Sequence, residues 1–255
     1  MNTVTSDAPF LVIGNWKMNG SRTLLGDFAR ELSAQSPAGC KRILCLPSVL
    51  LTSGVVSLSD VDVELGAQDC SEAPSGARTG EVSAGMLVEA GARWVIVGHS
   101  ERRAAFGETS TAVRDKAHAA AAAGLVPIIC IGESKTDRDA GRHLDVILEQ
   151  LELSMPPVAN ELLCVIAYEP VWAIGSGQSA SADQVAEAHG VIANWLNKKD
   201  CRIPVLYGGS VKPDSAPELA RLPHVDGFLV GGASLEPASF EDIAKQAAKA
   251  RLPMS

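Results

Sequence analysis

Residues 94–131 read WVIVGHSERRAAFGETSTAVRDKAHAAAAAGLVPIICI, and this stretch decides the fold. It opens with an apolar run at residues 94–99, continues through an alanine-rich segment at 110–123, and closes with a second apolar run at 127–131. Gly124 follows the alanine-rich segment, where a helix commonly stops. Runs that are apolar on both faces are typical of parallel strands covered on both sides. The stretch therefore predicts one strand–helix–strand unit of a parallel sheet.

The same alternation continues along the whole chain of 255 residues. Further strand-like runs lie at residues 10–15, 42–46, 63–68, 162–168, 204–207 and 227–230, and further helical patterns at 183–196 and 238–250. Strand–helix units of roughly 30 residues fill this length as a closed barrel better than as an open doubly wound sheet. We expect an α/β fold with a single (β/α)8 barrel over residues 10–255, preceded by a flexible tail at 1–9.

Composition and charge exclude several classes of protein. The chain has 22 Lys and Arg residues against 30 Asp and Glu residues, a net charge of −8, and no basic stripe. Nucleic-acid binding needs clustered positive charge, so no nucleic-acid partner is expected. The longest apolar runs are far shorter than the ~18 residues that span a membrane. The first ten residues, MNTVTSDAPF, also lack the pattern of a secretory signal. We expect a cytoplasmic protein without a membrane partner.

The six cysteines are scattered and show neither a C-x-x-C pair nor the spacing of a zinc site. Free thiols in a reducing compartment are therefore expected, and no metal. Cys45, Cys130 and Cys164 lie in apolar runs and are expected to pack as small apolar residues. Cys40 and Cys201 are expected at the surface.

Glycine-rich loops follow the last two predicted strands. Residues 208–210 read GGS and residues 231–233 read GGA. In a parallel barrel all strands end on one face, so the two loops are expected to be neighbours there. Glycine lets the backbone approach a ligand, and the amide groups of such loops bind anions. The loops predict a phosphate site, although tight turns alone would also explain the glycines.

Glu169 ends the sixth predicted strand and is followed by Pro170. Residues 170–180 have proline at one end and glycines at the other, which is typical of a lid that moves on two hinges. Trp172 and Ile174 in this lid would remove water from the carboxylate when the lid closes and make it a stronger base. The alternative is a solvated glutamate in a loop.

Two further ionisable side chains stand at predicted strand ends. His99 precedes a helix start at residues 100–103, and a helix N-terminus disfavours an imidazolium, so His99 is expected to act as a neutral donor. Lys17 ends the first strand and could pair with a phosphate or with Glu101. A structural histidine and a surface lysine are the alternatives. Residues 137–142, which include Arg138, are expected to form a solvated helix face.

Six motifs follow one another along the chain: GNWKMN at 14–19, GAQ at 66–68, GHSERR at 98–103, AYEPVWAIG at 167–175, YGGSV at 207–211 and GGASL at 231–235. Taken together and in this order, they resemble the triosephosphate isomerase family. The resemblance covers nearly the whole chain after residue 9 and implies a TIM barrel.

The resemblance implies an isomerase of glycolysis and gluconeogenesis that interconverts dihydroxyacetone phosphate and D-glyceraldehyde 3-phosphate through an enediolate, without a cofactor. Glu169 resembles the base that moves the proton, and His99 resembles the neutral electrophile. Lys17 and Asn15 resemble substrate contacts. The other residues implied are Gly175, Ser210, Gly231 and Gly232 at the phosphate, Ile174 and Leu229 as an apolar pair over the base, and Glu101, Ser100 and Cys130 behind the site.

The resemblance also implies a homodimer in which the loop at residues 69–81 enters the partner subunit. Thr79, Gly80, Glu81 and Arg102 are the expected interface residues, with Thr79 reaching Asn15 and Lys17 of the partner subunit. Such a contact suits two-fold symmetry.

Two positions depart from the family pattern. The lid reads Ser176-Gly177-Gln178, where Thr followed by Gly-Lys is usual, and Ser215 stands where Asn is common. The change in the lid puts the rate of lid motion in doubt. Ser215 puts in doubt a hydrogen bond between the loop and the following helix. Two other functions stay open: another phosphate-binding barrel enzyme such as an epimerase or lyase, and a catalytically retired barrel that only binds. The presence of Lys17, His99 and Glu169 weighs against both.

Overall fold

The computed structural model describes residues 8–156, 164–175 and 178–252. Eight parallel strands pair in chain order, and β8 pairs with β1 to close a barrel. The strands are β1 (Phe10–Asn15), β2 (Cys40–Cys45), β3 (Glu64–Ala67), β4 (Trp94–Val97), β5 (Val126–Ile131), β6 (Val165–Tyr168), β7 (Val205–Tyr207) and β8 (Gly227–Val230). The closed barrel confirms the expected (β/α)8 architecture.

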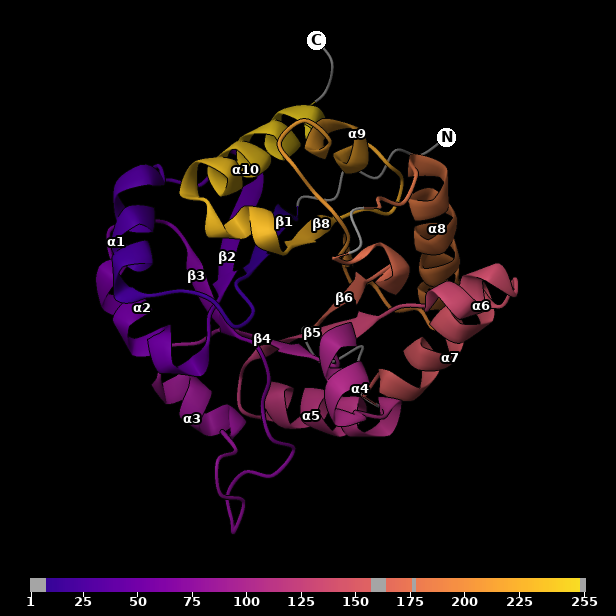
Figure 1. The fold of residues 1–255 in the computed structure, drawn as a ribbon, viewed down its shortest axis with the longest axis horizontal. Coiled ribbons are helices and arrows are strands. Elements are labelled where there is room, and N and C mark those ends of the chain that lie inside the picture. Colours follow the sequence, from indigo (N-terminus) through magenta and orange to yellow (C-terminus); the bar gives the residue numbers. More distant parts are fainter. Residues whose placement is uncertain (1–7, 157–163, 176–177, 253–255) are drawn as a thin grey trace.

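Helices surround the barrel as an outer ring (Figure 1). They are α1 (Arg22–Glu31), α2 (Leu51–Ser57), α3 (Ala84–Glu89), α4 (Ser100–Phe106), α5 (Ser110–Ala122), α6 (Lys135–Asp139), α7 (His143–Ser154), α8 (Ala182–Lys198), α9 (Ala216–Ala220) and α10 (Pro237–Arg251). Three short 3-10 helices also occur in the described ranges, η1 (Ser48–Leu50), η2 (Val171–Ala173) and η3 (Gly232–Leu235). Local signals fix several helix starts; for example, Ser181 and Gln184 form a capping box at α8.

The strands read as continuous apolar runs because both of their faces are buried. One face fills the barrel interior, and the other packs against the helices. The interior set is Leu11, Ile13, Ile43, Cys45, Trp94, Ile96, Ile128, Cys130, Val165, Ala167, Leu206 and Leu229. This filled interior makes the barrel a core and not a pore, so a ligand has room only at its ends.

Element bounds differ from the expectation in small ways with physical causes. β2 begins at Cys40 and not at residue 42, because its pairing with β1 extends to Phe10 and Cys40. β4 ends at Val97, because Gly98 has φ 68° and turns the chain out of the sheet. Residues 162–163 of the sixth predicted strand and residues 1–7 of the predicted tail lie outside the described residues.

All six cysteines are buried and free, so the surface position expected for Cys40 and Cys201 is wrong. Cys40 starts β2 and is 7% exposed, and Cys201 is 4% exposed within the layer between strands and helices. Burial raises the pKa of the Cys40, Cys70 and Cys164 thiols to about 12. Among the described residues, no helix is both long and apolar enough to cross a membrane.

Candidate active site

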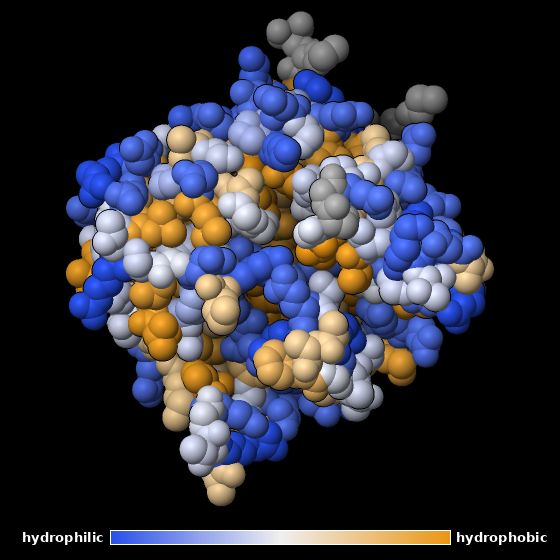
Figure 2. Space-filling model, viewed as in Figure 1, coloured by the Kyte–Doolittle hydropathy of each residue, from blue (hydrophilic) through white to orange (hydrophobic). Residues whose placement is uncertain are grey.

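A cavity of about 420 Å³ opens at the carboxyl ends of the strands. The face around it is seen in Figure 2, where hydrophilic residues gather near the middle of the barrel. Every catalytic and substrate-contact residue predicted from the sequence lines this cavity: Asn15, Lys17, His99, Glu169, Ile174, Gly175, Ser210, Leu229, Gly231 and Gly232. A larger groove of about 830 Å³ beside the loop after β3 is lined by other residues.

Glu169 follows β6 directly and is 1% exposed. The main-chain amide of Ser100, the first residue of α4, donates to Oε2 over 2.9 Å, and His99 Nε2 lies 2.9 Å from Oε1. The start of a helix is a favourable place for a carboxylate. The Cys130 thiol lies in the barrel interior close to this group, and burial together with the charge of Glu169 raises the pKa of Cys130. Glu169 is thus a desolvated carboxylate held by two donors.

His99 caps the N-terminus of α4, and its Nδ1 accepts a hydrogen bond of 3.2 Å from the Glu101 amide. This contact leaves Nε2 as the nitrogen that carries the proton and donates to Glu169. Burial lowers the pKa of His99, but the charge and hydrogen bond of Glu169, with Glu101, outweigh it and raise the pKa overall. The helix start therefore favours the expected neutral imidazole of His99. The present contact with Glu169 favours the protonated form instead.

Lys17 follows β1 with a left-handed φ of 51°, a conformation that costs energy for a residue with a side chain. Its amide donates to Asn15 Oδ1 over 3.0 Å. Its ammonium group reaches Glu101 Oε1 over 2.6 Å, and that carboxylate is 53% exposed. An exposed ion pair of this kind contributes little to stability. Lys17 also lines the cavity.

The glycine loops after β7 and β8 also line the cavity. A side-chain carbon at Gly231 would lie 3.6 Å from Lys17 Cε, and one at Gly208 would lie 3.0 Å from Glu169 Cγ. The backbone therefore runs close to both charged residues, and η3 begins just after Gly231. Further along the loop after β7, the Ser215 hydroxyl accepts from the Lys212 amide and donates to the Lys212 carbonyl, at the position where Asn is common.

The first part of the lid is tied to a buried carboxylate that sequence reasoning gave no role. Glu133 is fully buried and accepts from Trp172 Nε1 over 2.8 Å, from Arg138 Nε over 2.8 Å and from the Tyr168 hydroxyl over 3.2 Å. The solvated position expected for Arg138 is wrong, because its side chain is 13% exposed. The position of Glu133 at a strand end was the available signal. Ser176 and Gly177 of the lid lie outside the described residues.

Gly132 is a second residue whose importance only the fold reveals. A side-chain carbon at this position would lie 1.8 Å from the main-chain oxygen of Glu169. The Gln150 side chain also holds Gly132 on both sides, accepting from its amide over 3.0 Å and donating to its carbonyl over 2.9 Å. The segments that follow β5 and β6 therefore approach each other so closely that position 132 requires glycine. A glycine directly after a strand was the available signal.

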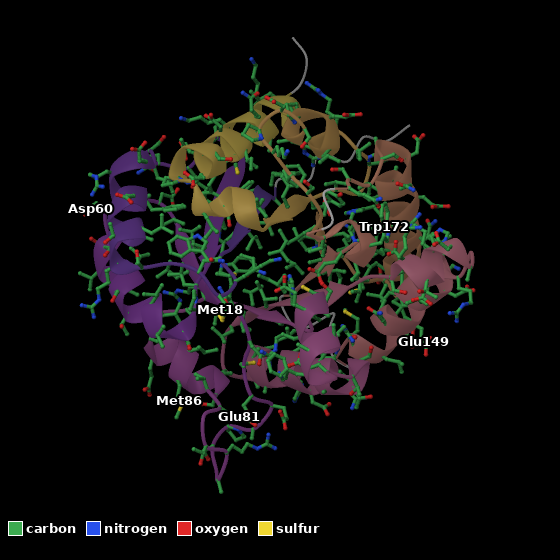
Figure 3. All side chains as sticks on the ribbon, viewed as in Figure 1. Met18, Asp60, Glu81, Met86, Glu149 and Trp172 are labelled. Atoms are coloured by element: carbon green, nitrogen blue, oxygen red, sulfur yellow. The ribbon has the colours of Figure 1, made fainter. Side chains whose placement is uncertain are left out.

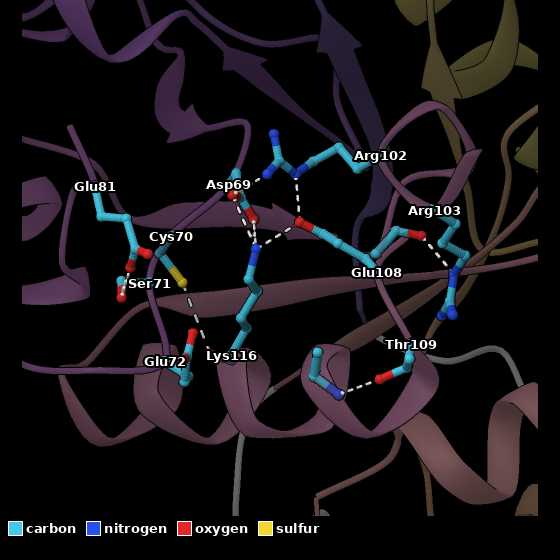
Figure 4. Close-up of polar contacts among 12 residues, drawn as sticks. Asp69, Cys70, Ser71, Glu72, Glu81, Arg102, Arg103, Glu108, Thr109 and Lys116 are labelled. Carbon is cyan, nitrogen blue, oxygen red and sulfur yellow. Dashed lines mark hydrogen bonds and ion pairs between the residues drawn. The ribbon is translucent and has the colours of Figure 1, made fainter. Parts of the chain in front are cut away.

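The loop after β3 projects away from the barrel (Figure 1). Thr79 and Gly80 are exposed, and Glu81 bonds to Ser71 and Arg78 within the loop. Figure 4 shows the network behind the loop, where Lys116 contacts Asp69 and Glu108. The predicted interface residue Arg102 joins the same network, 2.8 Å from Asp69 and 2.7 Å from Glu108.

Similarity to known proteins extends over the whole barrel. A family model described as triosephosphate isomerase matches residues 10–247. Triosephosphate isomerase of Granulibacter bethesdensis is 45% identical over 246 residues, 93% of this chain and 99% of that protein. Triosephosphate isomerase of Halorhodospira halophila is 47% identical over 246 residues, 94% of this chain and 98% of that protein. The crystal structure of triosephosphate isomerase from Bartonella henselae matches with a TM-score of 0.85 and 40% identity, covering 92% of this chain and 98% of that chain.

Proposed function

Because the chain belongs to the triosephosphate isomerase family, it is an isomerase of dihydroxyacetone phosphate and D-glyceraldehyde 3-phosphate, and we propose that Glu169, His99, Lys17 and Asn15 carry the reaction. The observation that supports these roles best is the contact of 2.9 Å between His99 Nε2 and Glu169 Oε1. It pairs a desolvated base with a proton donor inside a cavity that also holds Lys17 and Asn15.

The reaction moves one proton between adjacent carbons and changes no net oxidation state. Glu169 takes a proton from the substrate carbon and returns it to the neighbouring carbon. His99 donates the Nε2 proton to the carbonyl oxygen and takes back the proton of the hydroxyl on the adjacent carbon, so the imidazole ends neutral. Lys17 offsets the negative charge of the enediolate. When Glu169 turns from His99 to the substrate, the contact that raises the pKa of His99 is lost, and the neutral imidazole is favoured.

The phosphate group is proposed to lie at the glycine loops, against the amides of Gly175, Ser210, Gly231 and Gly232. Closure of the lid would bring Ile174 toward Leu229 and exclude water from the base. The bond from Trp172 to Glu133 holds the first turn of the lid in its present position. Closure that moves this indole must break that bond, so Glu133 favours the present conformation.

A coupled assay tests the function directly. Purified protein receives D-glyceraldehyde 3-phosphate, and dihydroxyacetone phosphate is followed through a reductase and NADH. We expect kcat/KM to approach the diffusional ceiling of about 10⁸ M⁻¹s⁻¹. A folded protein without activity would instead support a barrel that binds but does not catalyse.

His99→Gln is expected to lower kcat by about 10²-fold, because a single proton donor to the substrate oxygen is weakened but not removed. The amide of Gln retains a donor that can reach the same oxygen. The measurement is kcat at saturating substrate. A loss as large as that of a Glu169 variant would contradict this ranking of the two residues.

We also propose a homodimer in the cytoplasm. Large apolar side chains are exposed around the loop after β3: Met18 is 97% exposed, Met86 56% and Phe106 71%. Figure 3 places Met18, Met86 and Glu81 in the same part of the view. Exposed apolar groups of this kind favour a protein interface, and a self-complementary one suits two-fold symmetry. Thr79, Gly80, Glu81 and Arg102 are the proposed contacts.

Six free buried thiols support a reducing compartment.

Thr79→Arg is expected to convert the dimer to a monomer, because a long charged side chain would be forced into the interface. Light scattering coupled to size exclusion gives the mass. Thr136→Arg, at an exposed threonine of α6 away from the loop, is the matched control and should leave the mass unchanged. An unchanged mass for Thr79→Arg would count against the loop as the interface.

A further inference from the structure

Arg103 lies on α4, the helix that His99 caps, and joins segments that are distant in sequence. Its Nε donates to the Gly98 carbonyl over 2.9 Å, and its Nη2 donates to the Cys130 carbonyl over 3.1 Å. The remaining contacts of 3.1 Å reach the hydroxyls of Ser110 and Ser154. One guanidinium therefore links the ends of β4 and β5 with the start of α5 and the end of α7.

These contacts lie next to the proposed reacting groups. Gly98 precedes His99 and has a left-handed φ of 68°, so its carbonyl direction sets how the chain enters the helix cap. Cys130 precedes Ile131, whose carbonyl accepts the Glu169 amide over 2.8 Å. Arg103 thus holds the backbone on both sides of the contact between His99 and Glu169.

The charge of Arg103 is also unusual in its surroundings. All four of its bonded acceptors are neutral, and within residues 8–156, 164–175 and 178–252 no carboxylate lies within ion-pair distance of it. Burial lowers the pKa of the guanidinium, and the charges of Glu169 and Glu108 act in the opposite direction.

We propose that Arg103 is a positioning residue of the isomerase reaction, which fixes the backbone of His99 relative to that of Glu169. The inference rests on the proposed roles of those two residues. The role needs the planar fork of arginine, because one guanidinium holds four acceptors on separate segments.

Arg103→Lys and Arg103→Gln test this role. Lysine keeps the charge but cannot span the acceptors, so we expect kcat to fall about 10- to 100-fold, as for a misplacement approaching 1 Å. Glutamine should lower kcat at least as much, because its amide has too few N–H donors for the four acceptors. KM should stay within about two-fold, because the proposed phosphate loops follow β7 and β8. The measurement is steady-state kcat and KM.

The matched controls are Arg114→Lys and Arg114→Gln. Arg114 lies on the neighbouring helix α5, is 39% exposed and pairs with Asp115, so both controls should keep kcat and KM. A folded Arg103→Lys with normal kcat would overturn the positioning role. A purely structural role would lower the melting temperature and leave kcat and KM unchanged.

Ser154→Ala provides a second test if the Arg103 variants fail to fold. It removes one buried acceptor and leaves the cation in place. We expect kcat to fall several-fold with KM unchanged, and a normal kcat would contradict the positioning role. The inference fails alone if Glu169→Gln lowers kcat by about 10³-fold or more while the Arg103 and Ser154 variants keep a normal kcat. Inactivity of the unmodified protein would instead refute the proposed function.

Discussion

Glu169→Gln is expected to lower kcat by about 10³- to 10⁴-fold, the upper range of what a general base contributes. The amide cannot accept a proton from carbon at neutral pH. It keeps nearly the same shape, and its oxygen can still accept from either the Ser100 amide or His99 Nε2, though not from both. The other donor then loses its partner, which costs about 1–3 kcal/mol of folding free energy. The variant should therefore fold and bind substrate but not turn it over.

Kinetics and thermal unfolding of the same preparation check this expectation. Glu187→Gln, which removes a carboxylate that is 48% exposed on α8, is the matched control and should behave like the unmodified enzyme. A Glu169→Gln protein with a near-normal rate would remove Glu169 as the base. A protein that fails to fold would show that the carboxylate has a structural role as well.

Gly132→Ala is expected to damage both activity and stability, although it adds a single carbon atom. That atom would lie 1.8 Å from the Glu169 main-chain oxygen, which cannot rotate away as a side chain can. The chain after β5 or β6 must therefore shift, and a shift of about 1 Å at the base is expected to lower kcat about 10²-fold. Forcing an extra carbon into a packed site also costs about 1–3 kcal/mol.

Gly190→Ala supplies the contrast for this variant. Gly190 lies within α8 with open space where a side-chain carbon would be, and alanine favours a helix over glycine by about 1 kcal/mol. Urea unfolding and kcat of both variants give the comparison. A normal kcat and a normal free energy of unfolding for Gly132→Ala would mean that the segments after β5 and β6 are less rigid than their hydrogen bonds indicate.

The barrel and the cavity residues could be predicted because they depend on local patterns. A strand buried on both faces is apolar along its length, and a residue directly after such a strand must lie at the barrel mouth. Lys17, His99 and Glu169 each stand at the end of a predicted strand, so they were expected on one face of the barrel. No contact between distant segments was needed for these predictions.

The roles of Gly132, Arg138 and Arg103 could not be predicted, because they depend on distances across the barrel. Gly132 is required by a carbonyl that lies 37 positions later in the chain, and Arg103 by acceptors on four separate segments. Arg138 has the charged neighbours of a surface helix, but the indole of Trp172 and the carboxylate of Glu133 cover it. Sequence spacing carries no information on such approaches.

Because all six thiols are buried, chemical labelling of the native cysteines can report on unfolding. A thiolate attacks a disulfide reagent, and burial both disfavours the thiolate and shields it from the reagent. Labelling must therefore wait for a molecule to open. When closing is faster than labelling, the rate at each cysteine measures the free energy of the opening that exposes it. Cys40 on β2, Cys130 on β5 and Cys201 after α8 would then compare the stability of three sectors of the barrel without any engineered probe.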